Sequence, residues 1–457
     1  MAQVQDPLII SLCLMWSRLQ SLHRPAIAVA AASLPTLWHD RGSARGSAHG
    51  SASPGRSLGS LGPLSMRAIR CEAEPSQRET AEAFMKAAAM SATAGIRLQH
   101  GGPFGAAVVR NGVIISCAHN MVLEMQDPCC HAEMNAIQQA CQALGSHDLS
   151  DCELYTTCEP CPMCWGAVQW SRLGRAFIGV DRHTAAKYGF DDKVFYDEID
   201  AKAGHYGIRR TGYIADTSAG HLVPQGERVF KNMVDVYDGI LKEECESFFK
   251  DLTVNRTMRR RFTGKGGDQV QSAYKLVFDR ESQKRLPPSG PDKSPADHEK
   301  YMRLAMAVAA RGAKAGLAKE RECFGAVIVK DGVVLAEACN CVLSDRDATA
   351  TAEVKAIRAA TAHIGSYNLE GCDLYTTAHP DLMSLGAILW SRISNVYCGV
   401  TQQFVAHCGF EEGYLHLKDL LETDAGGAYV TQVIPGVAAY ECEQVFKEWS
   451  DRNGVVY

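Results

Sequence analysis

The 457-residue sequence lacks the features that mark membrane proteins, nucleic-acid-binding proteins and small disulfide-stabilised domains. Its apolar stretch at residues 8–16 is too short to cross a bilayer, which takes about 20 apolar residues. Its net charge is −5, so it has no basic excess that would attract nucleic acid. Its 18 cysteines do not follow the spacing of a short disulfide-bonded domain, which favours a reducing compartment. Together with the length, these absences predict a globular protein of two or three domains.

The segment 1–71 contains no lysine and almost no acidic residue. It holds seven arginines and many serines and alanines, with Asp6 and Asp40 as its only acids. Such a segment cannot bury a hydrophobic core, and its composition is typical of an organelle transit peptide. We therefore expect a targeting segment for the chloroplast or mitochondrion. A disordered extension of a cytoplasmic protein, a start at Met66, and a signal sequence built on residues 8–16 are the alternatives.

The motifs that carry chemistry lie between residues 131 and 164. His131 is followed two residues later by Glu133, and Cys161 is followed three residues later by Cys164. Zinc binds imidazole and thiolate ligands, and a catalytic zinc has three protein ligands and one open position. The pattern H-x-E…P-C-x-x-C is the zinc-deaminase signature, in which the Glu is an acid–base group and not a ligand. The alternative is a structural zinc site that uses Cys158 as a fourth ligand.

Local patterns place these residues at the starts of two helices. Apolar residues recur at helical spacing through 132–144, residues 152–157 alternate like a strand, and Pro162 suits the first turn of a helix. His131 should therefore open one helix, and Cys161 and Cys164 the next. The N–H groups at a helix start favour negative charge and lower the pKa of nearby thiols.

The surrounding elements predict an α/β fold. Residues 78–96 read as an amphipathic helix, and a hairpin over 104–119 turns at Asn111-Gly112, which suits a type I′ turn. A further strand is expected at 175–180, with a loop at 188–192. The order helix, hairpin, helix, strand, helix, strand predicts a sheet covered by helices on both faces.

The same pattern occurs a second time, 220 residues further along the chain. FGAAVVRNGVII from Phe104 corresponds to FGAVIVKDGVVL from Phe324, and the offset holds for LYTT, WSR and GF. Residues 251–296 are rich in Gly, Pro and basic residues and read as a linker; their Arg run could touch RNA or a membrane, although a solvated linker is the simpler interpretation. The predicted domains are 72–250 and 297–457.

The second copy has lost the metal ligands of the first. Thr351, Asp381 and Ser384 occupy the positions of His131, Cys161 and Cys164, whereas Glu133 is retained as Glu353. Hydroxyl groups do not replace soft thiolates as zinc ligands. The second domain is therefore predicted to be non-catalytic, with one zinc per chain bound by the first domain. A weaker possibility is a different metal bound by Asp381 together with His379.

At this level of detail the sequence resembles the cytidine deaminase superfamily, and within it the guanine and guanosine deaminase branch. The resemblance rests on GGPFGAAVV, CAHNMVLEMQDP, HAEMNAIQQAC, LYTTCEPCPMCWGA and GFDD, and it covers 78–237 and, more weakly, 300–457. It implies a three-layer α/β/α sandwich in two tandem copies. It also implies hydrolysis of guanine or guanosine to xanthine or xanthosine and ammonia, with Glu133 moving the protons. The substrate contacts that it implies are Asn120, Asp192, Phe104, Trp170 and the backbone of Ala132.

Each implied substrate contact has a simpler interpretation. Phe104 and Trp170 recur in the second copy and could be core residues, and Asn120 could satisfy local backbone groups. Asp192 is replaced by Glu412 in the second copy, which mildly favours a role that only the first copy needs.

The family resemblance also suggests an internal pseudo-dimer. In this branch a C-terminal segment ending in Tyr is exchanged between subunits and closes the partner's pocket. Residues 229–237 (VFKNMVDVY) resemble the segment VFKEWSDRNGVVY that ends at Tyr457. We expect Tyr457 to cover the first copy's pocket, so that deleting residues 446–457 would reduce turnover. A frayed terminus is the alternative. A homodimer of the whole chain is also possible.

Two other functions remain open at this point. One is a transfer-RNA adenosine deaminase in which the second copy is a binding platform, although the acidic balance and the absence of a basic patch with aromatic residues count against it. The other is a non-catalytic scaffold, against which the intact motif of the first copy argues.

Overall fold

The computed structural model describes residues 77–188, 208–212, 234–254, 293–312, 323–410 and 431–451. The predicted targeting segment 1–71, Asp192, Tyr457 and most of the predicted linker lie outside these residues. No helix in the described ranges is both long and apolar enough to cross a membrane.

The first repeat follows the predicted order of elements. Its helix α2 and its hairpin β1–β2 precede a helix–strand–helix–strand series that carries the motif residues. The elements are α2 (Gln77–Leu98), β1 (Gly105–Arg110), β2 (Val113–His119), α3 (Val122–Met125), α4 (Ala132–Leu144), β3 (Cys152–Cys158), α5 (Pro162–Trp170), β4 (Arg175–Val180), α6 (Arg182–Lys187), β5 (Ile208–Gly212), β6 (Val234–Asp238) and α8 (Lys242–Val254).

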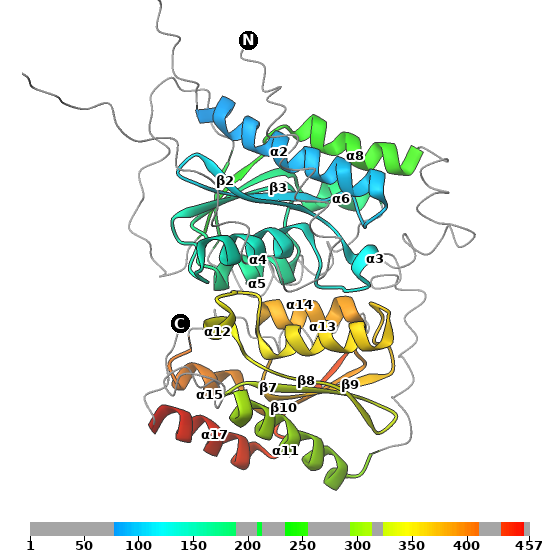
Figure 1. Cartoon of the computed structure of the whole chain (residues 1–457), viewed down its shortest axis with the longest axis vertical. Helices are drawn as coiled ribbons and strands as arrows, with labels where there is room; N and C mark the ends of the chain where they lie inside the picture. Colours follow the sequence, from blue (N-terminus) through cyan, green and yellow to red (C-terminus); the bar gives the residue numbers. More distant parts are fainter. Residues whose placement is uncertain are drawn as a thin grey trace, which may run out of the picture. The chain divides into compact units, whose positions relative to one another are not determined.

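Helices cover both faces of the first repeat's mixed sheet (Figure 1). The strand order is β2-β1-β3-β4-β6-β5; β1 is antiparallel to β2 and β3, and the remaining neighbours are parallel. Alternate residues of β1 face opposite layers: Val109 joins a cluster with α2 and α8, while Val108 joins one with α4 and α5. The predicted three-layer α/β/α sandwich is confirmed.

The second repeat has the same architecture. Its sheet has the order β11-β10-β9-β7-β8, which reproduces β6-β4-β3-β1-β2. Its elements are α11 (Pro295–Gly312), β7 (Gly325–Lys330), β8 (Val333–Cys339), α12 (Val342–Asp345), α13 (Ala352–Ile364), β9 (Cys372–Ala378), α14 (Leu382–Ser391), β10 (Asn395–Val400), α15 (Gln402–His407), β11 (Gln432–Ile434) and α17 (Ala439–Asp451).

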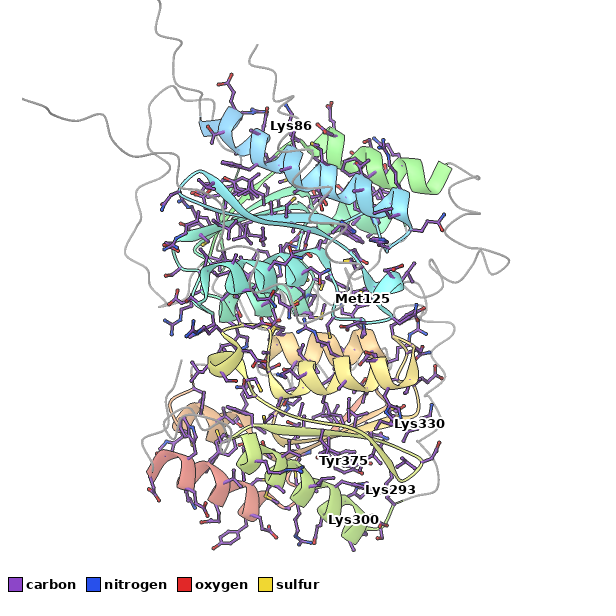
Figure 2. All side chains as sticks on the ribbon, in the orientation of Figure 1. Lys86, Met125, Lys293, Lys300, Lys330 and Tyr375 are labelled. Carbon is purple, nitrogen blue, oxygen red and sulfur yellow. The ribbon has the colours of Figure 1, made fainter. Side chains whose placement is uncertain are left out.

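Side chains fill the spaces between the helices and the sheet in both repeats, and lysines project from the outer layers (Figure 2). Tyr375 of β9 is buried and stacks on Tyr397 at a centroid distance of 4.8 Å. Lys86 on α2 and Lys300 on α11 are exposed. The outer helices therefore present one apolar and one solvated face, as amphipathic helices do.

The offset of 220 residues holds through the hairpin, the central helices and the strands β3 and β9. Both hairpins turn through two residues with positive φ, Asn111-Gly112 and Asp331-Gly332, as a type I′ turn requires. Both hairpins also have a register shift at corresponding positions, one after Val108 and one after Ile328. Backbone irregularities that recur at the same place indicate a duplicated fold and not merely a duplicated motif.

The offset changes near the end of each repeat, and this corrects our alignment of residues 229–237. Strand β6 pairs with β4 as β11 pairs with β10, and α8 corresponds to α17 at an offset of 197 residues. Gly179 lies against Cys245 of α8 as Gly399 lies against Cys442 of α17. Residues 234–237 therefore lie in a strand of the sheet, and the counterpart of that strand, β11, precedes α17.

The two repeats contact each other through reciprocal pairs of residues. A Cβ atom added at Gly166 of α5 would lie 2.4 Å from the backbone nitrogen of Met383, and one added at Gly386 of α14 would lie 2.6 Å from that of Met163. Because Gly386 and Met383 are the counterparts of Gly166 and Met163, each helix is used in the same way. This is the pattern of an isologous dimer interface, within one chain.

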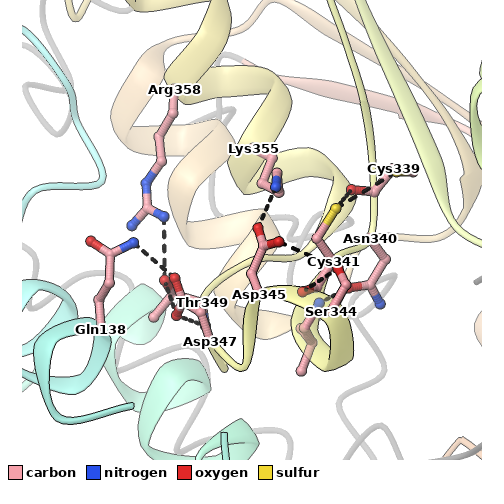
Figure 3. A network of polar contacts seen from close by, with 11 residues as sticks. Gln138, Cys339, Asn340, Cys341, Ser344, Asp345, Asp347, Thr349, Lys355 and Arg358 are labelled. Carbon is pink, nitrogen blue, oxygen red and sulfur yellow. Dashed lines mark hydrogen bonds and ion pairs between the residues drawn. The ribbon is translucent and has the colours of Figure 1, made fainter. Parts of the chain in front are cut away.

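Polar contacts between the repeats show the same reciprocity. Gln138 of α4 donates a hydrogen bond of 2.8 Å to Asp347, and Arg358 of α13 lies 3.7 Å from Asp127 (Figure 3 shows the first pair). Arg358 corresponds to Gln138, and Asp347 to Asp127. Burial and Asp127 act in opposite directions on the pKa of Arg358, and the net shift is upward, which keeps it charged. The exchanged pairs are those that an internal pseudo-dimer requires.

We predict that Gly166→Ala lowers the stability of the chain. Ala is normally better than Gly in a helix by about 1 kcal/mol, so an unobstructed substitution would stabilise α5. Here the new methyl group would meet the Met383 backbone, and such overpacking costs about 1–3 kcal/mol. Thermal unfolding should show a lower Tm for Gly166→Ala and for Gly386→Ala, but not for Lys86→Ala on an exposed face. An unchanged or raised Tm for both glycine variants would contradict this contact.

Candidate active site

The three predicted metal ligands lie at the starts of α4 and α5. His131 is the N-cap of α4 and Cys161 is the N-cap of α5; Pro162 occupies the first helical position, and Cys164 lies in the first turn. Both caps have extended backbone, with ψ of 159° at His131 and 168° at Cys161. At both positions the chain therefore turns sharply from a loop into a helix at the residue that carries the ligand atom.

The spacing of the three ligand atoms fits a tetrahedral zinc ion. The Cys161 and Cys164 sulfurs lie 3.6 Å apart, and His131 Nδ1 lies 3.4 Å from the first and 3.6 Å from the second. Zinc–sulfur bonds of about 2.3 Å and zinc–nitrogen bonds of about 2.0–2.1 Å give tetrahedral edges of about 3.8 and 3.6 Å. His131, Cys161 and Cys164 are also the group of potential ligands that converge within the described residues. Three ligands leave a fourth position, as in a catalytic site.

Glu133 lies beside this cluster and is buried. Its side chain is only 4% exposed; Oε1 accepts a hydrogen bond of 2.7 Å from Thr156, and Oε2 lies 3.4 Å from the Cys164 sulfur. Burial raises its pKa, and the Thr156 hydrogen bond opposes that shift. A buried carboxyl group held by Thr156, with a raised affinity for protons, is suited to accept and return a proton.

The two thiols have opposite tendencies before a metal binds. Burial alone would raise the pKa of Cys161, but hydrogen bonding to Cys164 and the facing His131 outweigh it, so that the pKa of Cys161 falls. Burial, together with the neighbouring Cys161, raises the pKa of Cys164. The pair therefore favours one thiolate and one thiol, and a bound cation would be needed to hold both as thiolates.

An aromatic residue from the second repeat lies against the site. The ring of Trp390, the last residue but one of α14, is 5.0 Å from the His131 ring in an edge-on arrangement. Trp170 lines a pocket of the second repeat and hydrogen-bonds to Asp381, and its predicted role as a wall of the first repeat's pocket stays a prediction. The two tryptophans are thus exchanged between repeats.

The remaining predicted substrate contacts are placed as follows. Asn120 is buried, and its side-chain oxygen accepts hydrogen bonds from the backbone of Gly102 and Val122. The contact is close: a Cβ on Gly101 would lie 2.0 Å from that oxygen. Phe104 packs edge-on against Phe249 of α8 at 5.6 Å. These contacts are structural, so substrate binding by both residues stays a prediction.

Ala132 is fully buried as the first residue of α4. It therefore follows the histidine ligand directly, and its substrate contact also stays a prediction. Asp192 and Tyr457 are not among the described residues, so their roles stay predictions as well.

The corresponding position in the second repeat is filled by a polar network. Ser384 Oγ lies 3.0 Å from Thr351 Oγ1, 2.9 Å from an Asp381 oxygen and 3.2 Å from a Glu353 oxygen, so its single hydrogen can be donated to either carboxyl group. Asp381 is the N-cap of α14, as Cys161 is of α5, and accepts from the Ser384 backbone. His379 contacts the Pro380 carbonyl, and no third ligand joins His379 and Asp381 within the described residues.

Two residues of the site were not found from the sequence. Thr156 positions Glu133, and its counterpart Thr376 makes the same contact to Glu353, so the repeated LYTT motif held the signal. Trp390 lies in the repeated WSR motif, but only the arrangement of the two repeats brings it to His131.

Known proteins that are similar to this chain are deaminases. The family model for the cytidine and deoxycytidylate deaminase zinc-binding region matches residues 78–180 and 295–400. Guanine deaminase from Bacillus subtilis (strain 168) is 44% identical over 152 residues, which are 33% of this chain and 96% of that protein. The tRNA-specific adenosine deaminase of the same organism is 35% identical over 163 residues, 35% of this chain and 83% of that protein. The X-ray structure of guanine deaminase from Bacillus subtilis is 48% identical in sequence to the matched part of this chain. The match covers 26% of this chain and 76% of the guanine deaminase chain, with a TM-score of 0.25.

The fold and the His-Cys-Cys site with its buried glutamate are those of a zinc-dependent hydrolytic deaminase. The chain belongs to the cytidine and deoxycytidylate deaminase zinc-binding family, and it contains the domain of that family twice.

Proposed function

We propose that the first repeat removes the amino group of guanine or guanosine by hydrolysis, giving xanthine or xanthosine and ammonia. The observation that carries this proposal is the ligand cluster with Glu133 beside it, in a repeat that matches nearly the full length of a bacterial guanine deaminase. The second repeat lacks the cluster, so we propose one zinc per chain, bound by the first repeat.

The chain's own residues account for the proton transfers. Glu133 takes a proton from water as the water oxygen bonds to the carbon that bears the amino group, and it passes that proton to a ring nitrogen. It then moves the second hydrogen of water to the amino nitrogen. The carbon–nitrogen bond then breaks, and ammonia leaves with the second hydrogen of water. A zinc ion held by His131, Cys161 and Cys164 supplies the Lewis acidity that makes water acidic near neutral pH. Thr156 holds Glu133 in place throughout.

We propose that the second repeat completes this site instead of catalysing a reaction of its own. It supplies Trp390, whose ring contacts the imidazole of His131 in an edge-on arrangement. An aromatic ring in that place excludes water and fixes the plane of the ligand, in the way that residues around a metal's ligands commonly do. The repeat is thus retained as an internal partner.

Replacing Trp390 tests this role. Loss of a residue that supports a metal ligand typically costs about 10–100-fold in metal affinity or activity. We expect Trp390→Ala to lower kcat/KM by about that factor and to weaken zinc retention during dialysis against a chelator. Trp390→Phe, which keeps a ring against His131, is the matched control and should recover most of the activity. Full activity and zinc retention in Trp390→Ala would show that the second repeat does not support the site.

A second candidate is deamination of adenosine in transfer RNA, favoured by the 35% identity to a tRNA-specific adenosine deaminase. A substrate panel separates the candidates: guanine, guanosine, adenine, cytidine and transfer RNA, assayed for ammonia release with the Glu133→Gln variant as the blank. Turnover of guanine or guanosine supports the proposal. Turnover of transfer RNA alone supports the second candidate, and no turnover of any substrate, with zinc bound, indicates a scaffold.

A further inference from the structure

The second repeat carries two cysteines, separated by one residue, where strand β8 ends and helix α12 begins. Cys339 is the last residue of β8, and Cys341 is the N-cap of α12. Their sulfurs lie 3.7 Å apart, and both residues are partly exposed (Figure 3). The sulfurs of Cys161 and Cys164 are equally close, but those residues are buried. The pair on β8 and α12 is therefore a dithiol that a reagent in solution can reach.

A lysine on α13 faces the second of these cysteines. Lys355 donates a hydrogen bond of 2.6 Å to Asp345 and lies within hydrogen-bonding reach of Cys341 (Figure 3). Hydrogen bonding from Cys339 and the positive charge of Lys355 lower the pKa of Cys341 to about 6, against the effects of burial and of Asp345. The same hydrogen bond raises the pKa of Cys339. At neutral pH the pair therefore favours a thiolate on Cys341 beside a thiol on Cys339.

Both protonation states of Cys341 have a partner. As a thiol it donates to the carbonyl of Cys339, 3.4 Å away. As a thiolate it accepts from the thiol of Cys339 and from Lys355. The side chain can therefore pass between the two states without a change of position.

The fold does not require this group of side chains. In the first repeat the positions of the two cysteines and of the lysine are filled by His119, Met121 and Asn135. The strand, the short helix and the long helix that carry them nevertheless have the same lengths in both repeats. Because the same turn forms without the dithiol and the lysine, packing alone does not account for them.

The spacing of the two cysteines permits a disulfide. Two residues of extended chain span at most about 7 Å, and disulfides join Cα atoms about 4.4–6.8 Å apart. The sulfurs would have to approach from 3.7 Å to about 2.05 Å. A strained or exposed disulfide is readily reduced again, so a bond closed over one intervening residue would be reversible.

We propose that Cys339 and Cys341 are a reactive dithiol site that reduces small disulfides of the glutathione type and is itself oxidised to an intramolecular disulfide. The Cys341 thiolate attacks one sulfur of the small disulfide, whose sulfur–sulfur bond breaks, and one small thiolate leaves. Cys339 then gives its proton to the released thiolate and attacks the Cys341 sulfur, and the second small thiolate leaves. The two cysteines lose two electrons, and the small disulfide gains them. This site is separate from the zinc site and does not depend on which substrate the first repeat converts.

Mass spectrometry tests this reaction, because cleavage after lysine and arginine releases residues 331–346 as one peptide that contains these two cysteines and no other. The full-length, zinc-loaded chain is incubated with glutathione disulfide at pH 6, and the remaining thiols are then alkylated in denaturant. We expect the peptide to lose two hydrogens and carry no alkyl group, and to regain both thiols with dithiothreitol. Cys408 is a partly exposed control whose pKa is raised by burial, and it should react about tenfold more slowly because less of it is thiolate at that pH.

Three variants separate the roles of the side chains. Cys339→Ser should stop at a mixed disulfide between glutathione and Cys341, because the second thiol is missing. Cys341→Ser should form neither the mixed nor the internal disulfide. Lys355→Gln should form the disulfide about threefold or more slowly at pH 6, because the thiolate loses a facing charge. Thermal unfolding verifies that each variant is folded.

Four results would overturn the proposal. Alkylation of both cysteines after the incubation would show that the pair does not react, and a mixed disulfide that persists in the unmodified chain would show that the sulfurs cannot join. A mixed disulfide on Cys339 in Cys341→Ser, formed as fast as the one on Cys341 in Cys339→Ser, would contradict the order of attack. An unchanged rate in Lys355→Gln would contradict the activation of Cys341 by the lysine.

Discussion

Glu133→Gln is expected to lower kcat by about 10²–10⁴-fold while the zinc content stays at that of the unmodified chain. Gln has the shape of Glu, and its side-chain oxygen can accept the same 2.7 Å hydrogen bond from Thr156. It cannot take up a proton, so the transfer from water to the substrate loses its carrier. Initial rates of ammonia release, together with metal analysis of the same samples, measure both quantities.

The control for this substitution is Glu153→Gln, on the same strand as Thr156. Glu153 pairs with Arg175 and accepts a hydrogen bond from Tyr155, and it is not part of the ligand cluster. We expect its kcat to change by less than twofold, because a partly exposed ion pair contributes about 0–1 kcal/mol to stability and nothing to proton transfer. If Glu133→Gln retained full kcat, or lost activity only together with zinc, the proton-carrier role would be rejected.

The helices and strands of each repeat could be predicted because their signals are local. Asn111-Gly112 determines the hairpin turn, Pro162 marks the start of α5, and the apolar spacing of 132–144 matches α4 to the residue. The metal ligands follow from the same logic, since helix starts fix where His131 and Cys161 can point. Structural features that depend on a few neighbouring residues can be predicted from the sequence.

The contacts between repeats could not be predicted in the same way. Trp170 and Trp390 both begin a WSR motif, and only the reciprocal packing of α5 on α14 brings each of them against residues of the other repeat. The alignment of residues 229–237 was wrong for a related reason. The shared letters VFK at 229–231 and 445–447 suggested that these segments correspond, whereas strand pairing shows that β6 corresponds to β11. Tertiary arrangement, not local propensity, determines these features.

Cys161→Ser is expected to reduce zinc binding by more than about 100-fold and to abolish detectable ammonia release. Loss of a residue that merely supports a ligand costs about 10–100-fold in affinity, so loss of a ligand should exceed that. A serine hydroxyl is a harder and much less acidic donor than the thiol whose pKa His131 and Cys164 lower, and it would have to lose its proton to ligate. The zinc content measured after dialysis should fall from one zinc per chain to a background level.

The matched control for the zinc experiment is Cys117→Ser. Cys117 lies on β2, away from the ligand cluster, and its sulfur donates to the carbonyl of Ala87, a contact that a serine hydroxyl can replace. This variant should retain one zinc and near-normal rates. A second zinc in the unmodified chain, or one zinc that persists in Cys161→Ser, would place metal outside the first repeat's cluster. Because Thr351, Asp381 and Ser384 bond to one another through their own oxygens, the second repeat already satisfies at that position the groups that a metal would otherwise bind.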